Sequence, residues 1–355
     1  MLLSESGIVH KQVTSTRVAY IRFNMKARIE IKQTMQEIAQ NMPPENICGD
    51  PYCQIQFFSS YREGYEAEVG FPVKDEVEVG CIKTKTSLAL EVLALMHSSA
   101  SEKVPETRAW LVEFSRHNGL ISDEFTREVH LDWQHLQGDI EVQFVLHRWN
   151  ALLACHLERV LGRQKQAAVL KGRDAIGVET DLTQRFLWTK SAIERLNGLA
   201  DEVQKYDIVS SCAHIFPAGM LESLKRVYND ARLKHSDVLQ AVDEVLAFME
   251  NDPGWGPTDQ RREGRVIIRT KNPADPQAHQ AASTAEEKRA AYCFCPVIRK
   301  NLQQGMPPTY CYCGAGWFRQ QWEHATGKPV RVEVLQSVAQ GDDVCQFALH
   351  LADEL

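Results

Sequence analysis

YEAEVGFPV, at residues 65–73, and DIEVQFVLH, at residues 139–147, are the two stretches that decide the fold. In each of them apolar side chains alternate with polar ones, which is typical of a β-strand with one buried face. Each stretch also closes the same series of elements, in which a strand and a helix are followed by two more strands. The chain therefore predicts two copies of a βαββ unit in tandem.

The first copy starts with the strand-like segment VAYIRF at residues 18–23 and continues with a helix over residues 28–40. The second copy takes its first strand from residues 79–96 and its helix from residues 104–119. One helix covers only one face of a small sheet, so the other face stays free. We expect the two free faces to line a common cleft.

This order of elements resembles the GyrI-like domains, which also serve as effector-binding domains of AraC-type and MerR-type regulators. The resemblance covers about residues 15–149 and rests on His97, the helix VPETRAWLVEFSRHNGL and the strand that carries Glu141. It implies a pseudo-twofold pair of βαββ units around a small-molecule cleft, with Glu141 pointing into the cleft. Glu68 holds a related position in the first copy, and His97 and Trp110 complete the ligand-binding set.

The residue types around Glu141 agree with that implication. Glu141 and Gln143 share one strand face, while Ile140 and Val142 point to the other. A carboxylate that is buried without a partner is costly, so a cleft keeps one for a counter-charge or a hydrogen-bond donor. Such a group selects cationic or hydroxylated ligands. The alternative is that Glu141 lies on a solvated strand face and binds nothing.

The segment after His97 departs from the family pattern. The chain has Ser98-Ser99-Ala100 where family members usually have glycine and then an aromatic residue. The aromatic wall of the cleft is therefore missing, and the ligand class stays open. Some family members hydrolyse reactive electrophiles, which would make His97 a candidate general base. A histidine at a strand end also fits simple packing.

The composition is that of a globular protein. Of the 355 residues, 44% are hydrophobic and 25% are charged. The formal net charge of −7 disfavours direct nucleic-acid binding, which needs a basic face. No apolar run is long enough to span a membrane, and MLLSESGIVHK has neither the basic nor the apolar stretch of a secretory signal. We therefore expect a cytoplasmic protein, of the bacterial kind to which the family belongs.

Beyond the tandem repeat the pattern changes twice. Residues 150–254 read as helices throughout and predict a helical connector. Residues 255–355 return to mixed structure and end in two alternating strands, VRVEVLQSV and VCQFALHL, joined by a turn. The predicted fold is thus α+β, with a GyrI-like domain at residues 1–149, the connector, and a cysteine-bearing α/β domain that ends in a β-hairpin.

Half of the ten cysteines lie near the end of the chain. Two Cys-X-Cys pairs, Cys293 with Cys295 and Cys311 with Cys313, are followed by Cys345 in the last strand. Residues two apart share a face in an extended segment, so each pair presents two sulfurs together. We predict that all five sulfurs converge on one site. In a reducing compartment, clustered cysteines indicate metal or thiol chemistry rather than disulfides.

Three interpretations of these cysteines stay open. Four thiolates can hold zinc, although the usual spacing of a zinc knuckle is Cys-X-X-Cys. A reactive pair would use Cys313 with Cys311, because the helix that opens at Gly314-Ala315-Gly316 places Cys313 near a helix N-terminus, where the thiolate is stabilised. The third interpretation is that the cysteines are small buried residues of a core.

The segment CYCGAGWFRQQWE…GKPVRVEVLQSV…GDDVCQF resembles the 4-vinyl-reductase-like small-molecule-binding domains. In sensory members of that family, a Cys–Glu–Cys group near this hairpin binds zinc. Glu333 and Cys345 match that group, but Ser337 stands where a cysteine is expected. Cys212 and His214, in the helical region, are candidates to complete a zinc site.

Two functions follow as predictions. The first is non-covalent binding of a small organic molecule, apolar or cationic, by a sensor or a sequestering protein. The second is a hydrolase, or another thiol- or metal-assisted enzyme, that acts on a small electrophile. The sequence has no GxSxG, HExxH, P-loop or GxGxxG motif, so no standard catalytic or nucleotide-binding motif supports the enzyme.

Overall fold

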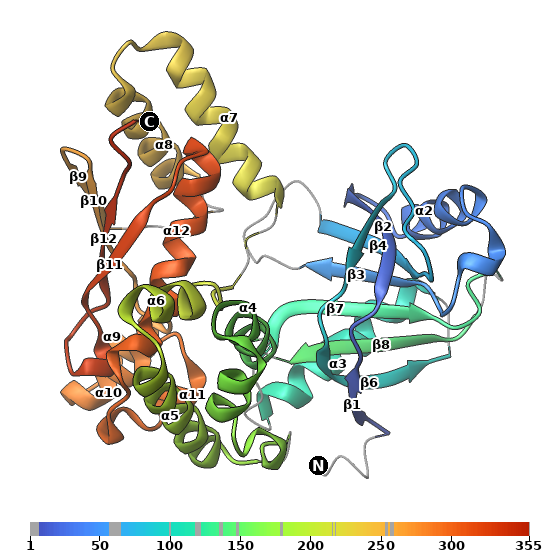
Figure 1. Cartoon of the computed structure of the whole chain (residues 1–355), viewed down its shortest axis with the longest axis horizontal. Helices are drawn as coiled ribbons and strands as arrows, with labels where there is room; N and C mark the ends of the chain where they lie inside the picture. Colours follow the sequence, from blue (N-terminus) through green and yellow to red (C-terminus); the bar gives the residue numbers. More distant parts are fainter. Residues whose placement is uncertain are drawn as a thin grey trace. The chain divides into compact units, whose positions relative to one another are not determined.

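The computed structural model describes residues 7–56, 65–98, 101–117, 122–134, 138–146, 149–177, 180–214, 216, 218–252, 255 and 259–354. The chain divides into two compact units, Met1–Ala151 and Leu152–Leu355 (Figure 1). Each unit combines helices with an antiparallel sheet, so the predicted α+β class is confirmed. Among the described helices, none combines the length and the apolar character needed to cross a membrane.

The first unit contains the predicted repeat and two additional strands. The first copy is β2-α2-β3-β4 and the second copy is β6-α3-β7-β8, while β1 and β5 lie outside the repeat. The bounds of these elements are β1 Val9–Val13, β2 Arg17–Met25, α2 Ile29–Gln40, β3 Tyr52–Gln56, β4 Tyr65–Pro72, β5 Lys83–Thr86, β6 Leu90–His97, α3 Val104–His117, β7 Ser122–His130 and β8 Ile140–Leu146.

The eight strands of the first unit form one sheet, in the order β1-β6-β8-β7-β3-β4-β2-β5. The two copies meet edge to edge where β3 pairs with β7, with Tyr52 opposite Val129 and Gln54 opposite Arg127. Because both copies contribute the strand that follows their helix, the junction has pseudo-twofold symmetry. Because the sheet is continuous, the faces of the two copies that the helices leave free form one common surface.

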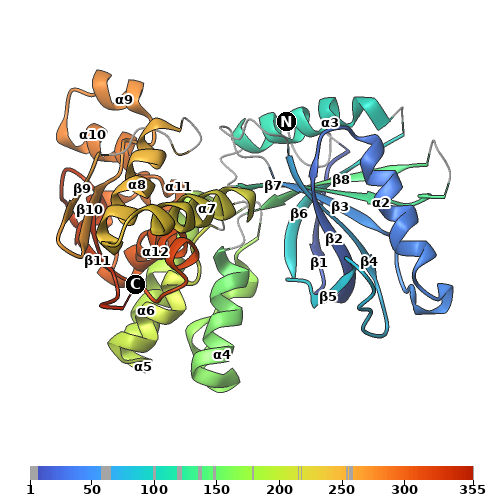
Figure 2. The same ribbon diagram turned by 90° about the horizontal axis from the view of Figure 1, so that it is seen from above.

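Both helices of the first unit cover the same face of this sheet (Figure 2). Ile31, Met35 and Ile38 of α2 belong to one apolar cluster with residues of β2, β3 and β4, such as Ile21 and Val69. The helix α3 packs along β6 and β8. Since neighbouring residues of a strand point to opposite faces, the alternate positions of each strand face away from the helices.

The second unit begins with helices, continues through mixed structure and ends in strands. Its long helix α4 is interrupted at Gly162, which has a positive φ of 77°. The bounds are α4 Trp149–Val169, α5 Leu182–Leu199, α6 Glu202–Ser210, α7 Ala218–Lys234, α8 Val238–Asn251, β9 Asp259–Glu263, β10 Val266–Thr270, α9 Pro276–Ala281, α10 Ala285–Tyr292, α11 Pro296–Arg299, α12 Tyr312–Thr326, β11 Arg331–Gln336 and β12 Gln346–His350.

One apolar core joins the sheet of the second unit to its helices. The strand order is β11-β12-β10-β9, and the pairing of β11 with β12 confirms the predicted terminal hairpin. Phe318 and Trp322 of α12 belong to the same cluster as Val245 of α8 and Leu349 of β12. The helices predicted as a separate connector therefore lie in one compact unit with the cysteine-bearing segment.

Two glycines allow α12 to approach its neighbours. A Cβ on Gly316 would lie 1.8 Å from the carbonyl oxygen of Ser210, and one on Gly314 would lie 2.9 Å from the ring of Phe347. No other residue type fits such a separation. The helix starts at Tyr312 with Cys311 as its N-cap residue, slightly before the start that the sequence predicts.

Candidate functional site

A row of polar side chains crosses the sheet face opposite the helices of the first unit. Residues that stand directly opposite one another in a sheet share a face. From β8 to β2 the register places opposite one another Gln143, Arg127, Gln54, Glu68 and Arg22. Four further residues lie on the same sheet face: Lys11, Tyr52, Lys85 and Glu141. We call these four residues and the row together the polar face.

Glu68 is the enclosed carboxylate of the polar face, with only 5% of its surface exposed. Its Oε1 accepts a hydrogen bond of 2.9 Å from the Tyr52 hydroxyl, and its Oε2 lies 2.8 Å from Arg22 Nε and 2.5 Å from Lys85 Nζ. Burial by itself would raise the pKa of Glu68, but Lys85 and Arg22 together hold that pKa below its ordinary value. Glu68 is therefore ionised and fully paired.

Arg127 connects the two carboxylates of the polar face. It is buried, its guanidinium lies 4.2 Å from the centre of the Tyr52 ring, and it donates a 3.0 Å hydrogen bond to Gln143 Oε1. Gln143 in turn donates a 2.6 Å hydrogen bond to Glu141 Oε1. Burial lowers the pKa of Arg127, and the charges of Tyr52, Glu141 and Glu68 oppose that shift.

Glu141 lies at the more open end of this network. Its Oε1 is 2.5 Å from Lys11 Nζ, and the side chains of Lys11 and Glu141 are 37% and 18% exposed. Sequence reasoning identified Glu141 but missed its partner, because β1 shows no clear alternation. Arg127 was also missed, although its phase within EFTREVHLD places it on one strand face with Val129.

The structure separates the predicted ligand set. His97 is buried on the helix-covered face, where its Nδ1 lies 2.8 Å from Oγ1 of Thr107 on α3. Its position is one residue out of phase with Met96, which stands opposite Glu141. Trp110 belongs to α3 and packs against Phe114. His97 and α3, which carries Trp110, therefore lie on the other side of the sheet from Glu141, because a shift of one strand position moves a side chain to the opposite face.

A separate ion pair is buried on the helix-covered face. Arg28, which precedes α2, binds both oxygens of Glu128, at 2.9 Å and 2.5 Å. Nε2 of His130 lies 3.8 Å from the same carboxylate. Burial lowers the pKa of His130 to about 4, despite the opposing effect of Glu128. This group ties the start of α2 to the second copy of the repeat.

Four of the five C-terminal cysteines interact electrostatically with Lys271, namely Cys293, Cys311, Cys313 and Cys345. We call the five cysteines the thiol cluster. Cys311 Sγ lies 3.0 Å from the Ser337 hydroxyl, and Cys295 Sγ lies 2.9 Å from the Tyr310 hydroxyl. The fifth sulfur, that of Cys295, interacts electrostatically with Cys293. Convergence of all five sulfurs on one site stays a prediction.

The zinc site predicted for these cysteines does not fit the structure. Among the described residues, no three histidine, cysteine, aspartate or glutamate side chains are placed to hold a metal ion. Glu333 is exposed and pairs with His350 at 3.4 Å, and Cys212 donates to the Ile208 carbonyl oxygen. Burial raises the pKa of Cys311 to about 12, so its thiol form is favoured. The side chain of Lys271 lies within electrostatic range of four of these sulfurs.

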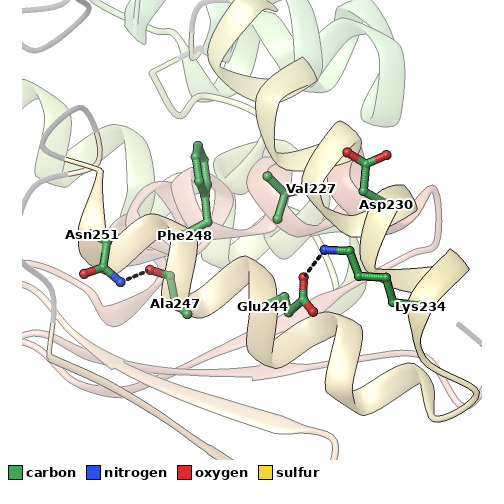
Figure 3. A pocket seen from close by; sticks show the side chains of 7 residues that line it. All are labelled: Val227, Asp230, Lys234, Glu244, Ala247, Phe248 and Asn251. Atoms are coloured by element: carbon green, nitrogen blue, oxygen red, sulfur yellow. Dashed lines mark hydrogen bonds and ion pairs between the residues drawn. The ribbon is translucent and has the colours of Figure 1, made fainter.

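A shallow groove also lies between α7 and α8 (Figure 3). Three of its polar side chains are paired, because Lys234 binds Glu244 at 3.3 Å and Asn251 donates to the Ala247 carbonyl oxygen. Val227 and Phe248 pack against the core of the second unit. The groove contains none of the residues that the sequence predicts as functional.

A family model matches only the C-terminal part of the chain. A family of unknown function (DUF6144) matches residues 283–355, which contain the thiol cluster. No curated protein matches the chain.

Several solved structures are similar to 39% of the chain. The C-terminal domain of EcmrR has 20% identity, a TM-score of 0.34 and 96% of its own chain covered. The chain spans 56% of EcmrR as it occurs in a complex with DNA. A hydrolase from Listeria innocua has 12% identity, a TM-score of 0.28 and 90% coverage. SAV2435 bound to tetraphenylphosphonium has 11% identity, a TM-score of 0.27 and 93% coverage.

Proposed function

We propose that the polar face of the first unit binds a small organic cation, which replaces the Lys11 ammonium beside Glu141. The protein would then act as a sensor or a sequestering protein for such molecules. The observation that carries the proposal is the Lys11–Glu141 ion pair, with its 2.5 Å separation and its partial exposure. In this ion pair, Lys11 of the same chain occupies the place beside Glu141 that we propose for the ligand cation.

The position of Lys11 makes exchange with a ligand favourable. Lys11 stands on β1, at the edge of the sheet, and its side chain is long and flexible. A partly solvated pair of this kind contributes only about 0–1 kcal/mol to stability. A ligand cation can therefore displace Lys11 into water without leaving a buried carboxylate unpaired, which would cost several kcal/mol, on the order of 3–5.

The neighbours of Glu141 supply apolar surface. Met96 stands directly opposite Glu141 across the β6–β8 pair and is 45% exposed. Val129 stands opposite Glu141 on β7, and Tyr52 follows on β3. The flexible thioether of Met96 suits the hydrocarbon part of an organic cation, whereas Tyr52 is buried beneath Arg127.

Glu68 has a different part in this proposal. Two cations and a tyrosine hydroxyl already occupy its oxygens, so it offers no site to a ligand. Through Tyr52 it supports the ring on which Arg127 lies. Arg127 then orients Gln143, which donates to Glu141. Glu68 is thus a positioning residue for Glu141.

The test uses the full chain and isothermal titration calorimetry, with tetraphenylphosphonium as the cationic probe and triphenylphosphine oxide as a neutral one. Glu141→Gln should weaken binding of the cation at least tenfold and leave binding of the neutral probe unchanged. Lys11→Met should strengthen binding of the cation several-fold, because the competing ammonium is gone. Both effects should shrink with added salt.

Lys234→Met is the matched control, because it removes a partly exposed lysine–glutamate pair from the second unit. It should leave the affinity unchanged. Equal affinity of the wild type and Glu141→Gln for the cation would overturn the proposal, as would weaker binding after Lys11→Met. A higher affinity after Lys234→Met would place the probe beside Glu244 in the groove between α7 and α8 instead.

A further inference from the structure

Lys271 is placed among aromatic rings by the strand that precedes it. Its backbone N–H donates a 3.0 Å hydrogen bond to the Cys345 carbonyl oxygen, which extends the pairing of β10 with β12 by one residue. Its Nζ lies near four ring centres at distances of 4.8, 5.2, 5.6 and 5.7 Å, those of Trp317, Phe294, Phe318 and Phe347.

The Lys271 amine has no conventional partner. Among the described residues, its Nζ makes no hydrogen bond and no ion pair. It lies over four aromatic rings. Burying a neutral polar group without a hydrogen bond costs roughly 2–7 kcal/mol, and burying an unpaired charge costs more. A charged side chain away from water is therefore normally paired. Burial accordingly lowers the pKa of Lys271, which favours the free amine.

Arg269, two residues earlier on the same strand face, shows how a structural cation is treated in this core. It is fully buried, donates a 2.8 Å hydrogen bond to Gln321 and stacks on Phe318 at 4.8 Å. Lys271 lacks such an acceptor and remains partly exposed. Methionine or leucine would pack among these rings without the cost of desolvating an amine. The presence of an amine at position 271 therefore needs an explanation.

We propose that Lys271 is a nucleophilic amine that forms a Schiff base with a small apolar aldehyde or ketone. The aromatic rings of Phe294, Trp317, Phe318 and Phe347 would hold the apolar part of that carbonyl compound. The proposal is independent of cation binding by the first unit.

The chemistry balances without an oxidant or a reductant. The Nζ lone pair attacks the carbonyl carbon, and the carbonyl oxygen takes up a proton to give a carbinolamine. The nitrogen gives up one proton at this stage. The carbinolamine hydroxyl then takes up a second proton and leaves as water while the nitrogen lone pair forms the C=N bond, and the nitrogen returns its remaining proton to solvent, so that one carbonyl and one amine give one imine and one water. The thiols of Cys311 and Cys345 lie within electrostatic range of the amine and are candidate proton donors to the oxygen.

The test is reductive trapping on the full chain at neutral pH, with benzaldehyde as the probe and sodium cyanoborohydride as the trap. Intact mass should show one added benzyl group, and peptide mapping should place it on Lys271. Lys288 is exposed and serves as the internal control within the same sample. Lys271 should be labelled at least tenfold faster than Lys288, and benzyl addition at that position should disappear in Lys271→Met.

The outcomes separate amine chemistry from thiol chemistry. Thiol adducts of aldehydes reverse on dialysis, whereas a reduced amine adduct survives. Labelling of Lys271 at the rate of Lys288, or only after denaturation, would overturn the proposal. If Lys271→Met does not fold, the ratio of the two rates in the wild type still decides, because it needs no variant.

Discussion

Glu68 and Glu141 stand on the last strands of the two copies and share one sheet face, yet only Glu68 is enclosed. Two cations and the Tyr52 hydroxyl bind Glu68, whereas a single exposed lysine and Gln143 bind Glu141. The pseudo-twofold repeat therefore carries one enclosed carboxylate with three partners and one carboxylate in a more open pair, for which we propose exchange with a ligand. This asymmetry makes the two residues separable by mutation.

Glu68→Gln should destabilise the protein, because Arg22, Lys85 and the Tyr52 hydroxyl lose a shared acceptor in a nearly closed site. We expect a loss of about 1–3 kcal/mol in the free energy of unfolding. Glu141→Gln should stay within about 0.5 kcal/mol of the wild type. Chemical denaturation of the two full-length variants checks the pair, and equal losses would contradict the assignment of roles.

Stability should fall on acidification through His130. Its folded pKa of about 4 is below its unfolded value, so the unfolded chain binds the proton first as the pH falls. The stabilisation is complete above about pH 6.5 and is lost towards pH 4, to the extent of roughly 3 kcal/mol. Glu68, with its lowered pKa, acts in the same direction at lower pH. In a series of thermal melts, His130→Gln should flatten the profile between pH 6.5 and 4, and an unchanged slope would rule His130 out.

Gly316→Ala should destabilise the second unit, because its Cβ would meet the Ser210 carbonyl oxygen at 1.8 Å and α12 would have to move away from α6. We expect a loss of about 1–3 kcal/mol or more. Gly198→Ala is the matched control, since it also lies in a helix but its Cβ would meet nothing within 4 Å. It should be neutral or stabilising, by up to about 1 kcal/mol. Similar melting temperatures for both variants would show that the contact at Gly316 does not limit stability.

Local pattern was enough to predict most elements of the fold. Period-two alternation identified β4 and β8 and put Glu141 with Gln143 on one face, because side-chain direction along a strand depends on neighbours in the chain. The same reasoning identified the terminal hairpin. It missed β1, whose half-exposed residues leave no periodic signal. The grouping of His97 with Glu141 came from the family resemblance and not from alternation, and His97 lies one residue away from Met96, on the other face.

The sequence by itself determined the tandem repeat and the strand face that Glu141 shares with Gln143, because both depend on spacing along the chain. The tertiary structure alone decided which charges meet. Lys11 reaches Glu141 through the pairing of β1 with β6, and the amine of Lys271 lies over rings from α12 and β12 that are distant in sequence. Desolvation and ion pairing act between residues that only the folded chain brings together.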